Sequence, residues 1–310
     1  MPVDSHHVPV LLEEALHGLS VLPNGAYIDC TFGRGGHSQQ ILNRLDSRGR
    51  LYLLDQDPRA IEVAKERYNN DSRVHVVHES FSNLQEIAKQ DDLTAKINGI
   101  FFDLGVSSPQ LDVADRGFSF TQDGPLDMRM NTDTGITAAQ WLDKISIADL
   151  VTVLKEYGEE KFAKKIASRV IEEQRRSPIE TTTKLSEIVC ACYPRNYQGI
   201  HPATRTFQAI RIAINQELHA LKSGLEASFG MLSNGGRLVV ISFHSLEDRI
   251  VKRFIRDSKG EDPMPRLPIM PAQKDHLKSV GKLIRPSEEE MKNNPRSRSA
   301  KMRIAEKVVM

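Results

Sequence analysis

The stretch that decides the fold is Tyr27-Ile28-Asp29-Cys30-Thr31-Phe32-Gly33-Arg34-Gly35-Gly36-His37. A short apolar run ends at Asp29, a glycine-rich loop follows, and helical spacing begins at Gly36. Glycines let the backbone approach a ligand closely, and the start of a helix offers N–H groups to it. The stretch therefore predicts the nucleotide-side binding loop of a Rossmann-like domain, although a purely structural turn would show the same glycines.

Strands and helices alternate on both sides of this loop through the first hundred residues. The predicted strands cover residues 26–30, 50–55, 74–77 and 97–104, and the helices between them cover 36–45, 58–68 and 82–89. Alternation at this spacing is typical of a parallel, doubly wound sheet with helices on both faces.

The alternation stops after the fourth strand. No buried strand is expected between 108 and 204, where helices are predicted at 138–142, 147–157, 160–175 and 182–192. A long helix at 206–232, a strand at 235–243 and a helix at 246–256 follow, and 300–308 is expected as a final edge strand. We therefore expect a sheet domain in two parts, 1–107 and 205–310, a helical insert at 108–204, and a flexible excursion at 259–294.

Bulk composition narrows the class of protein. The chain has 310 residues, of which 39% are hydrophobic and 27% charged, and these values suit a globular protein with one large domain plus an insertion. The net charge is only +1, so a nucleic-acid partner would require clustered basic residues. Cys30, Cys190 and Cys192 lack C-x-x-C spacing, so no metal is expected. We see no signal peptide and no membrane span, and expect a cytoplasmic protein.

A carboxylate after the second strand narrows the kind of ligand that the loop is expected to bind. Asp55 stands about twenty residues beyond the loop, where an acid can accept both ribose hydroxyls of an adenosine. The alternative is that Asp55 or Asp57 only caps the next helix, because Asp57-Pro58 is a good helix start. We interpret Asp57 as the cap and Asp55 as the ligand.

Two details of the loop separate NAD from S-adenosyl-L-methionine. The dinucleotide fingerprint requires a third glycine or a close variant, and Ser38 occupies that place. Asp29, four residues ahead of Gly33, is placed as in methyltransferases, where such an acid can lie near the methionine amino group. These details favour S-adenosyl-L-methionine.

The fourth strand leads into the predicted catalytic loop, Asp103-Leu104-Gly105-Val106-Ser107-Ser108-Pro109-Gln110. It resembles the loops of enzymes that methylate exocyclic amines of bases, but it lacks an aromatic residue directly after the proline. Phe118 and Phe120 are the candidates to stack on a base instead. Acceptors such as Asp103 would localise the amine lone pair and aim it at the methyl group. The alternative is that Asp103 caps a turn, and for the serines of the loop this structural role is preferred.

Several longer motifs resemble one family. They are His7-Val-Pro-Val-Leu-Leu-Glu-Glu14, Asp29 to His37, Asp103 to Gln110, Arg116-Gly-Phe-Ser-Phe120, Gly124-Pro-Leu-Asp-Met-Arg129, His201-Pro-Ala-Thr-Arg-Thr-Phe207 and Ser242-Phe-His-Ser-Leu-Glu-Asp-Arg249. By these motifs the chain resembles the RsmH (MraW) family. The resemblance implies a Rossmann-like class I methyltransferase that acts on the cytosine N4 of a decoding-centre cytidine in 16S rRNA. It further implies that the substrate is the assembled small ribosomal subunit.

The resemblance also implies the cofactor contacts, residue by residue. They are Gly35, Gly36, His37, Asp55, Phe81, Asp103 and Gln110, with Gly33 and Asp29 as further candidates. Phe81 follows the third strand, where an apolar side chain could flank the adenine. A homodimer is compatible with the sequence, which does not set the oligomeric state.

Basic residues suggest a substrate face. Arg195, His201 and Arg205 lie in a stretch without acids, and with Phe118 they are our candidate RNA contacts. The C-terminal run adds Arg296, Arg298, Lys301, Arg303 and Lys307 against Glu306 alone. For any single residue of these, an ordinary solvated surface explains the charge equally well.

A histidine after the fifth strand is a weaker catalytic candidate. His244 and Asp248 stand at the ligand end of the sheet, but a histidine with an acid four residues on also suits a local pairing at a helix start. Direct methyl transfer without a covalent intermediate is expected, because Cys30 lies in the wrong loop to attack a base.

Two alternatives stay open at the level of the residues. An NAD-dependent oxidoreductase would share the glycine loop and Asp55 but would leave the Asp103 loop unexplained. A non-catalytic ribosome-assembly factor could bind the cofactor only as a structural ligand.

Overall fold

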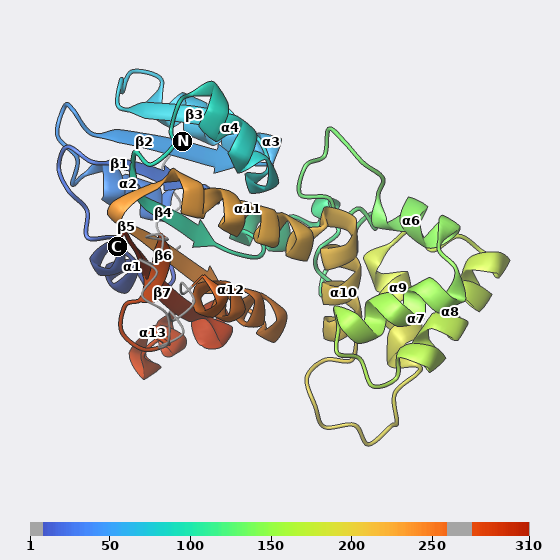
Figure 1. The fold of residues 1–310 in the computed structure, drawn as a ribbon. Coiled ribbons are helices and arrows are strands. Elements are labelled where there is room, and N and C mark those ends of the chain that lie inside the picture. Colours follow the sequence, from blue (N-terminus) through green and yellow to red (C-terminus); the bar gives the residue numbers. More distant parts are fainter. Residues whose placement is uncertain (1–8, 259–274, 310) are drawn as a thin grey trace. The chain divides into compact units, whose positions relative to one another are not determined.

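The computed structural model describes residues 9–258 and 275–309, which form two compact units. The first unit combines the described residues up to Gly105 with those from Leu218 onward, and the second is Val106–Glu217 (Figure 1). No described helix is both long and apolar enough to cross a membrane.

The first unit is built on a seven-stranded sheet. Its strands are β1 (Ala26–Asp29), β2 (Arg50–Asp55), β3 (Val74–His78), β4 (Ile97–Asp103), β5 (Leu232–Ser242), β6 (His276–Ser279) and β7 (Lys301–Val308). The order is β3-β2-β1-β4-β5-β7-β6, with β1 to β5 parallel and β7 antiparallel to both of its neighbours. This confirms the prediction of a doubly wound, mostly parallel sheet. The order reverses between β1 and β4, where such sheets bind ligands.

Helices cover both faces of this sheet (Figure 1). They are α1 (Leu12–Leu19), α2 (Gly36–Leu42), α3 (Pro58–Tyr68), η1 (Phe81–Asn83), α4 (Leu84–Gln90), α11 (Glu217–Met231), α12 (Ser245–Asp257), α13 (Glu288–Asn293) and η3 (Pro295–Ser299). Successive strand residues enter opposite cores: Phe101 packs with α1 and α2, and Phe102 with α4 and α11. Burial on both faces explains why these strands are continuously apolar rather than alternating.

The second unit contains helices and loops. Its elements are α5 (Ser108–Asp112), η2 (Ala114–Arg116), α6 (Ala138–Lys144), α7 (Ile147–Glu156), α8 (Ala163–Arg176), α9 (Thr182–Cys190) and α10 (Ala203–Asn215). Thr137, Ser146 and Thr181 cap α6, α7 and α9 through their side-chain oxygens. All members of its hydrophobic core belong to the unit itself, so each unit has its own core.

The long helix expected at 206–232 is wrong. The structure has α10 and α11 instead, separated at Gln216, whose left-handed backbone (φ 50°) ends α10. Phe207 and Ile210 of α10 are buried in the core of the second unit. The second unit therefore ends at Glu217, beyond the boundary of 204 drawn from the sequence.

The excursion expected at 259–294 is also corrected for its described part. Residues 259–274 lie outside the described residues, but 275–294 contain β6 and α13. Glu290 of α13 accepts a hydrogen bond from the backbone N–H of Leu11 at 2.8 Å. β7 is not an edge strand, since it lies between β5 and β6. Residue alternation shows which side chains are buried but not which strand is outermost.

Candidate active site

The glycine loop that follows β1 is tightly constrained. Gly33 and Gly35 have positive φ values of 54° and 74°. A Cβ on Gly35 would lie 2.4 Å from the ring of Phe32, and one on Gly36 would lie 2.3 Å from Pro9. Glycine is therefore required here by both backbone conformation and space. A loop without Cβ atoms at the switch point of the sheet fits the close approach of a nucleotide-type cofactor.

Asp29 is hydrogen-bonded within this loop. Its carboxylate accepts hydrogen bonds from the Ser38 hydroxyl at 2.5 Å and the Thr31 N–H at 3.1 Å. The side chain is 1% exposed, and burial raises its pKa to about 6. These bonds give Asp29 a structural role in the loop, and the second lone pair of each oxygen leaves it a candidate to lie near the methionine amino group. Ser38, noted only as a mismatch to the dinucleotide fingerprint, is the residue that Asp29 requires.

Asp55 links the end of β2 to the same loop. Its two oxygens accept the N–H groups of Gly33 at 2.8 Å and Asp57 at 2.9 Å, and burial raises its pKa to about 6. Each carboxylate oxygen has a second lone pair, so Asp55 can still accept ribose hydroxyls. Asp57 accepts the Arg59 N–H and caps α3 with Pro58 in the first turn, as predicted.

Asp103 ends β4 next to the glycine loop. Its backbone N–H donates to the Thr31 hydroxyl at 2.7 Å, which ties β4 to the loop after β1. Its Oδ1 is buried and has no hydrogen-bond partner among the described residues. Burial, and then the charges of Asp29 and Glu247, raise its pKa to about 8. A buried acceptor without a donor is costly, so this oxygen is suited to a donor supplied by a ligand.

The His37 side chain lies beside Asp103. Its Nδ1 is 3.7 Å from Asp103 Oδ2, and its Nε2 is 3.0 Å from the Val10 carbonyl oxygen. The ring also packs on Phe101 with 4.5 Å between centroids. Since a carbonyl can only accept, Nε2 carries a hydrogen in this arrangement and Nδ1 faces the carboxyl group.

The remaining predicted cofactor residues lie in different units. Phe81 is half-buried in the first unit, in η1 just after β3, with its ring edge-on to Phe102 at 5.4 Å. Gln110 belongs to the second unit, where its Oε1 accepts the Ser107 N–H at 2.9 Å and completes the capping box of α5. Ser107 thus holds the shape of the loop that follows β4, which is the structural role expected for the serines of this loop.

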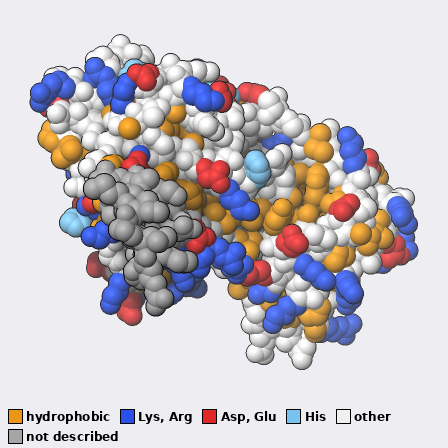
Figure 2. Space-filling model, in the orientation of Figure 1, with side chains coloured by type: hydrophobic (Ala, Val, Ile, Leu, Met, Phe, Trp, Pro, Cys, Tyr) orange, Lys and Arg blue, Asp and Glu red, His pale blue; other side chains and the backbone are white. Residues whose placement is uncertain are grey.

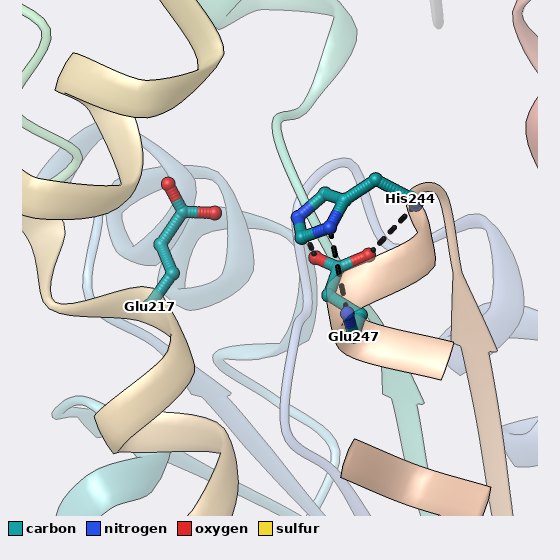
Figure 3. Close-up of side chains that lie close together, drawn as sticks. All are labelled: Glu217, His244 and Glu247. Atoms are coloured by element: carbon teal, nitrogen blue, oxygen red, sulfur yellow. Dashed lines mark hydrogen bonds and ion pairs between the residues drawn. The ribbon is translucent and has the colours of Figure 1, made fainter. Parts of the chain in front are cut away.

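His244 starts a helix. Its Nδ1 accepts the Glu247 N–H, and the Glu247 carboxylate in turn accepts the His244 N–H (Figure 3). Glu247 also accepts the N–H of Phe243. The pairing across the helix start is therefore with Glu247, whose carboxylate lies 3.2 Å from His244 Nε2, and not with Asp248. Asp248 pairs instead with Arg303 of β7 at 2.7 Å. The structure thus favours the local helix-start interpretation of His244 over a catalytic one.

The candidate substrate residues of the second unit separate into exposed and buried groups. Phe118 is 6% exposed and packed in the core, so its ring is not available to stack on a base. Phe120 is half-buried, and the exposed His201 stacks on it at 4.4 Å with 9° between the planes. Arg195 is exposed, whereas Arg205 donates to the Glu159 carbonyl at 3.1 Å.

Acids neutralise much of the basic surface expected from the sequence. Arg211 of the second unit forms a two-pronged ion pair with Glu217, which is also labelled in Figure 3. In the C-terminal run, Lys301 and Arg303 lie near Asp248, Lys307 pairs with Asp275, and Glu306 pairs with Arg237. These ion pairs reduce the positive charge of the run, and the partners come from distant parts of the chain.

Comparison with known proteins identifies the family. Residues 4–308 match the model described as the MraW methylase family. The chain is 53% identical to ribosomal RNA small subunit methyltransferase H of Hydrogenovibrio crunogenus over 98% of this chain and 97% of that protein. It is 52% identical to the protein of the same name from Idiomarina loihiensis (97% of each chain), and 51% identical to that of Coxiella burnetii strain Dugway 5J108-111 (97% and 99%). Neither an NAD-dependent oxidoreductase nor a non-catalytic assembly factor is supported. The chain belongs to the MraW methylase family.

Proposed function

We propose that this protein uses S-adenosyl-L-methionine to methylate the N4 amine of a decoding-centre cytidine in 16S rRNA of the small ribosomal subunit. The family is one of methylases, and relatives at 51–53% identity carry the name ribosomal RNA small subunit methyltransferase H. The observation that carries the proposal is Asp103, which ends β4 beside the glycine loop with a buried oxygen that lacks a donor. An exocyclic amine supplies such a donor.

The proposed cofactor site lies along the carboxyl ends of β1, β2 and β4. S-adenosyl-L-methionine, when bound there, supplies a methyl group on an activated sulfonium. The loop of Gly33, Gly35 and Gly36 lets the backbone approach it closely, and Asp55 accepts the ribose hydroxyls. Phe81 flanks the adenine. His37, Asp103 and Gln110 complete the contacts that the family resemblance implies, and Asp29 acts by fixing the loop.

The proposed chemistry of the chain is orientation and proton transfer. A cytosine amine is a poor nucleophile, because its lone pair is delocalised into the ring. Asp103 Oδ1 accepts one N–H of the amine and so helps to localise and aim that lone pair. Asp103, with its pKa raised to about 8, can then hold the proton that the amine loses. No covalent bond between enzyme and base is required.

The second unit is proposed to bind the RNA. One support is the stack of His201 on Phe120, in which the His201 imidazole is exposed. The other is Arg195, which is exposed and lies nearby in sequence. Base–aromatic stacking tolerates any base, and arginine contacts phosphate. Arg205 helps to anchor the start of α10, and Phe118 supports this surface from the core.

We further propose where the enzyme acts. Its partner is the assembled small subunit in the cytoplasm, and the reaction uses no metal ion. A homodimer is compatible with this proposal, and sedimentation of the purified protein measures it.

Nucleoside mass spectrometry tests the proposal. Unmodified small subunits are incubated with S-adenosyl-L-methionine and either the wild-type protein or Asp103→Asn. We expect N4-methylcytidine with the wild type and a rate on the order of 10² to 10³ lower with the variant, which no longer offers a charged acceptor. Circular dichroism checks that the variant folds. Absence of N4-methylcytidine with folded wild-type protein would overturn the proposal.

A further inference from the structure

The exposed face of α12 carries a row of basic side chains. Arg249, Lys252, Arg253 and Arg256 are all exposed. Their spacing of three, four and seven residues places them on one side of the helix. Leu246, Val251 and Ile255 are buried on the other side. In the view of Figure 2, Lys and Arg side chains gather over the position that α12 has in Figure 1.

The acids of α12 neutralise only part of this row. Glu247 is directed inward to the N–H groups of Phe243 and His244. Asp248 is held by Arg303 at 2.7 Å, and Asp257 pairs with Arg256 at 2.6 Å. Neither Lys252 nor Arg253 forms an ion pair with any residue within 9–258 or 275–309.

The elements packed against α12 add positive charge. They are β5, β6 and β7. On β6, Lys278 is exposed, and on β7, Lys301 and Arg303 outweigh the single charge of Asp248. Glu306 on β7 forms an ion pair with Arg237, and Asp275 just before β6 forms one with Lys307. The row is therefore the exposed side of a region with excess positive charge.

No other exposed helix of the first unit has this arrangement among the described residues. On α3, the exposed Arg59, Lys65 and Arg67 are interleaved with the exposed Glu62 and Glu66. That pattern is typical of an ordinary solvated helix surface. The row on α12 therefore requires a different explanation from surface solubility.

The helix α12, which carries the row, starts at the reacting end of the sheet. The helix begins directly after β5, at the edge where β1 and β4 also end. From Arg249 to Arg256 the row extends about 10 Å at 1.5 Å per residue.

We propose that the row Arg249, Lys252, Arg253 and Arg256, with Lys278, binds the sugar–phosphate backbone of the RNA substrate. This inference rests on the proposed function, in which the substrate is RNA. Long, exposed, flexible cations fit phosphates and carry no base selectivity, so the row holds and orients the RNA without reading its sequence. The sheet unit thus contributes to RNA binding independently of the helical unit.

The test removes two charges from the row and compares a matched control. Lys252→Gln/Arg253→Gln keeps good helix formers, and Arg59→Gln/Lys65→Gln removes the same charge from α3. Binding to small subunits and to protein-free 16S rRNA is measured over a range of salt concentrations. We expect the α12 variant to bind both about 10-fold more weakly, with the slope of log K against log salt smaller by about one to two. The control should match the wild type.

The outcomes separate this inference from the proposed function. Cofactor affinity should be unchanged in the α12 variant, since the row is proposed to bind RNA and not the cofactor. Equal salt slopes for the α12 variant and the control would overturn the inference. So would an α12 variant that binds small subunits more weakly but binds protein-free rRNA as tightly as the wild type. If the wild type binds RNA but transfers no methyl group, the proposed function fails while the comparison of slopes still decides the role of α12.

Discussion

At the scale of single residues, three carboxyl groups define the reacting end of the sheet: Asp29, which is buried, and Asp55 and Asp103, which are half-buried. Asp29 and Asp55 have pKa values raised to about 6, and that of Asp103 is raised to about 8, in each case mainly by burial. Their ionised forms are costly in the ligand-free protein. A ligand that carries positive charge and hydrogen-bond donors offsets this cost, which is the electrostatic logic of a sulfonium cofactor and an amine substrate.

The raised pKa of Asp103 predicts how stability depends on pH. The folded protein binds this proton more tightly than the unfolded chain does, since the pKa rises from 3.8 to about 8. The stabilisation is complete below the unfolded pKa and is lost as pH rises toward 8. Urea unfolding of the ligand-free protein should therefore show lower stability at pH 8 than at pH 6. Asp103→Asn should flatten this dependence, and an unchanged dependence in the variant would contradict the assignment.

A substitution at Cys30 tests whether the methyl group is transferred directly to the base. Its thiol is buried, and burial followed by the charge of Asp29 raises its pKa well above the usual range, so no thiolate is available to attack a base. Cys30→Ala should cost about 1 kcal/mol of stability or less but leave methyl transfer within a few-fold of the wild type. Mass spectrometry of the denatured protein after reaction should show no RNA adduct on Cys30; detection of one would reject direct transfer.

At the scale of elements, the start of α12 decides the role of His244. The residue caps the helix, and Glu247 closes the capping box from inside. The same helix joins the sheet through the pairing of Asp248 with Arg303, residues that are 55 positions apart. A histidine near the reacting end of the sheet is thus used to build the helix that carries the basic row.

A pair of substitutions separates capping from catalysis at His244. Asparagine is a good N-cap and alanine is a poor one, so His244→Ala should lose about 1 kcal/mol of stability and His244→Asn much less. Both should retain the methyl-transfer rate at saturating substrate. Urea unfolding and kinetics on small subunits measure the two effects. An equal, large loss of rate in both variants would restore His244 as a catalytic residue.

At the scale of the whole molecule, the two units have separate hydrophobic cores. The core of Val106–Glu217 contains no residue of the sheet unit, and the two cores on the faces of the sheet contain none of the second unit. Since packing is the main source of stability, each unit should respond to its own core substitutions.

The only tryptophan makes this independence measurable. Trp141 lies in α6 of the second unit, so its fluorescence reports that unit alone. Leu154→Ala, at a fully buried position of this unit, should cost about 2–5 kcal/mol and shift the tryptophan transition to lower urea. Cofactor binding by calorimetry should persist. Leu54→Ala in β2 is the matched change in the sheet unit and should weaken cofactor binding instead. Equal effects of both changes on both readouts would show a single cooperative unit.

Much of the sheet unit was predictable because its signals are local. Alternating strands and helices predicted the parallel sheet, and Asp57-Pro58 predicted the start of α3. The break at Gln216 was not predictable, because apolar helical spacing continues across it and glutamine does not mark a left-handed residue. The apolar side chains before the break pack in the core of the second unit, and those after it pack in a core of the first unit. Only the packing distinguishes the two sets.

By itself the sequence from Asp29 to His37 determined a nucleotide-type loop, and with Asp55 and the Asp103 loop it favoured methyl transfer. The longer motifs along the chain identified the family. Those features depend on residue type and short spacing. Tertiary structure alone decided that Asp29 is hydrogen-bonded to Ser38, that Phe118 is buried, and which cations have acidic partners. The physical reason is that burial and pairing depend on partners distant in the chain, as between Asp248 and Arg303, and a linear pattern does not contain those distances.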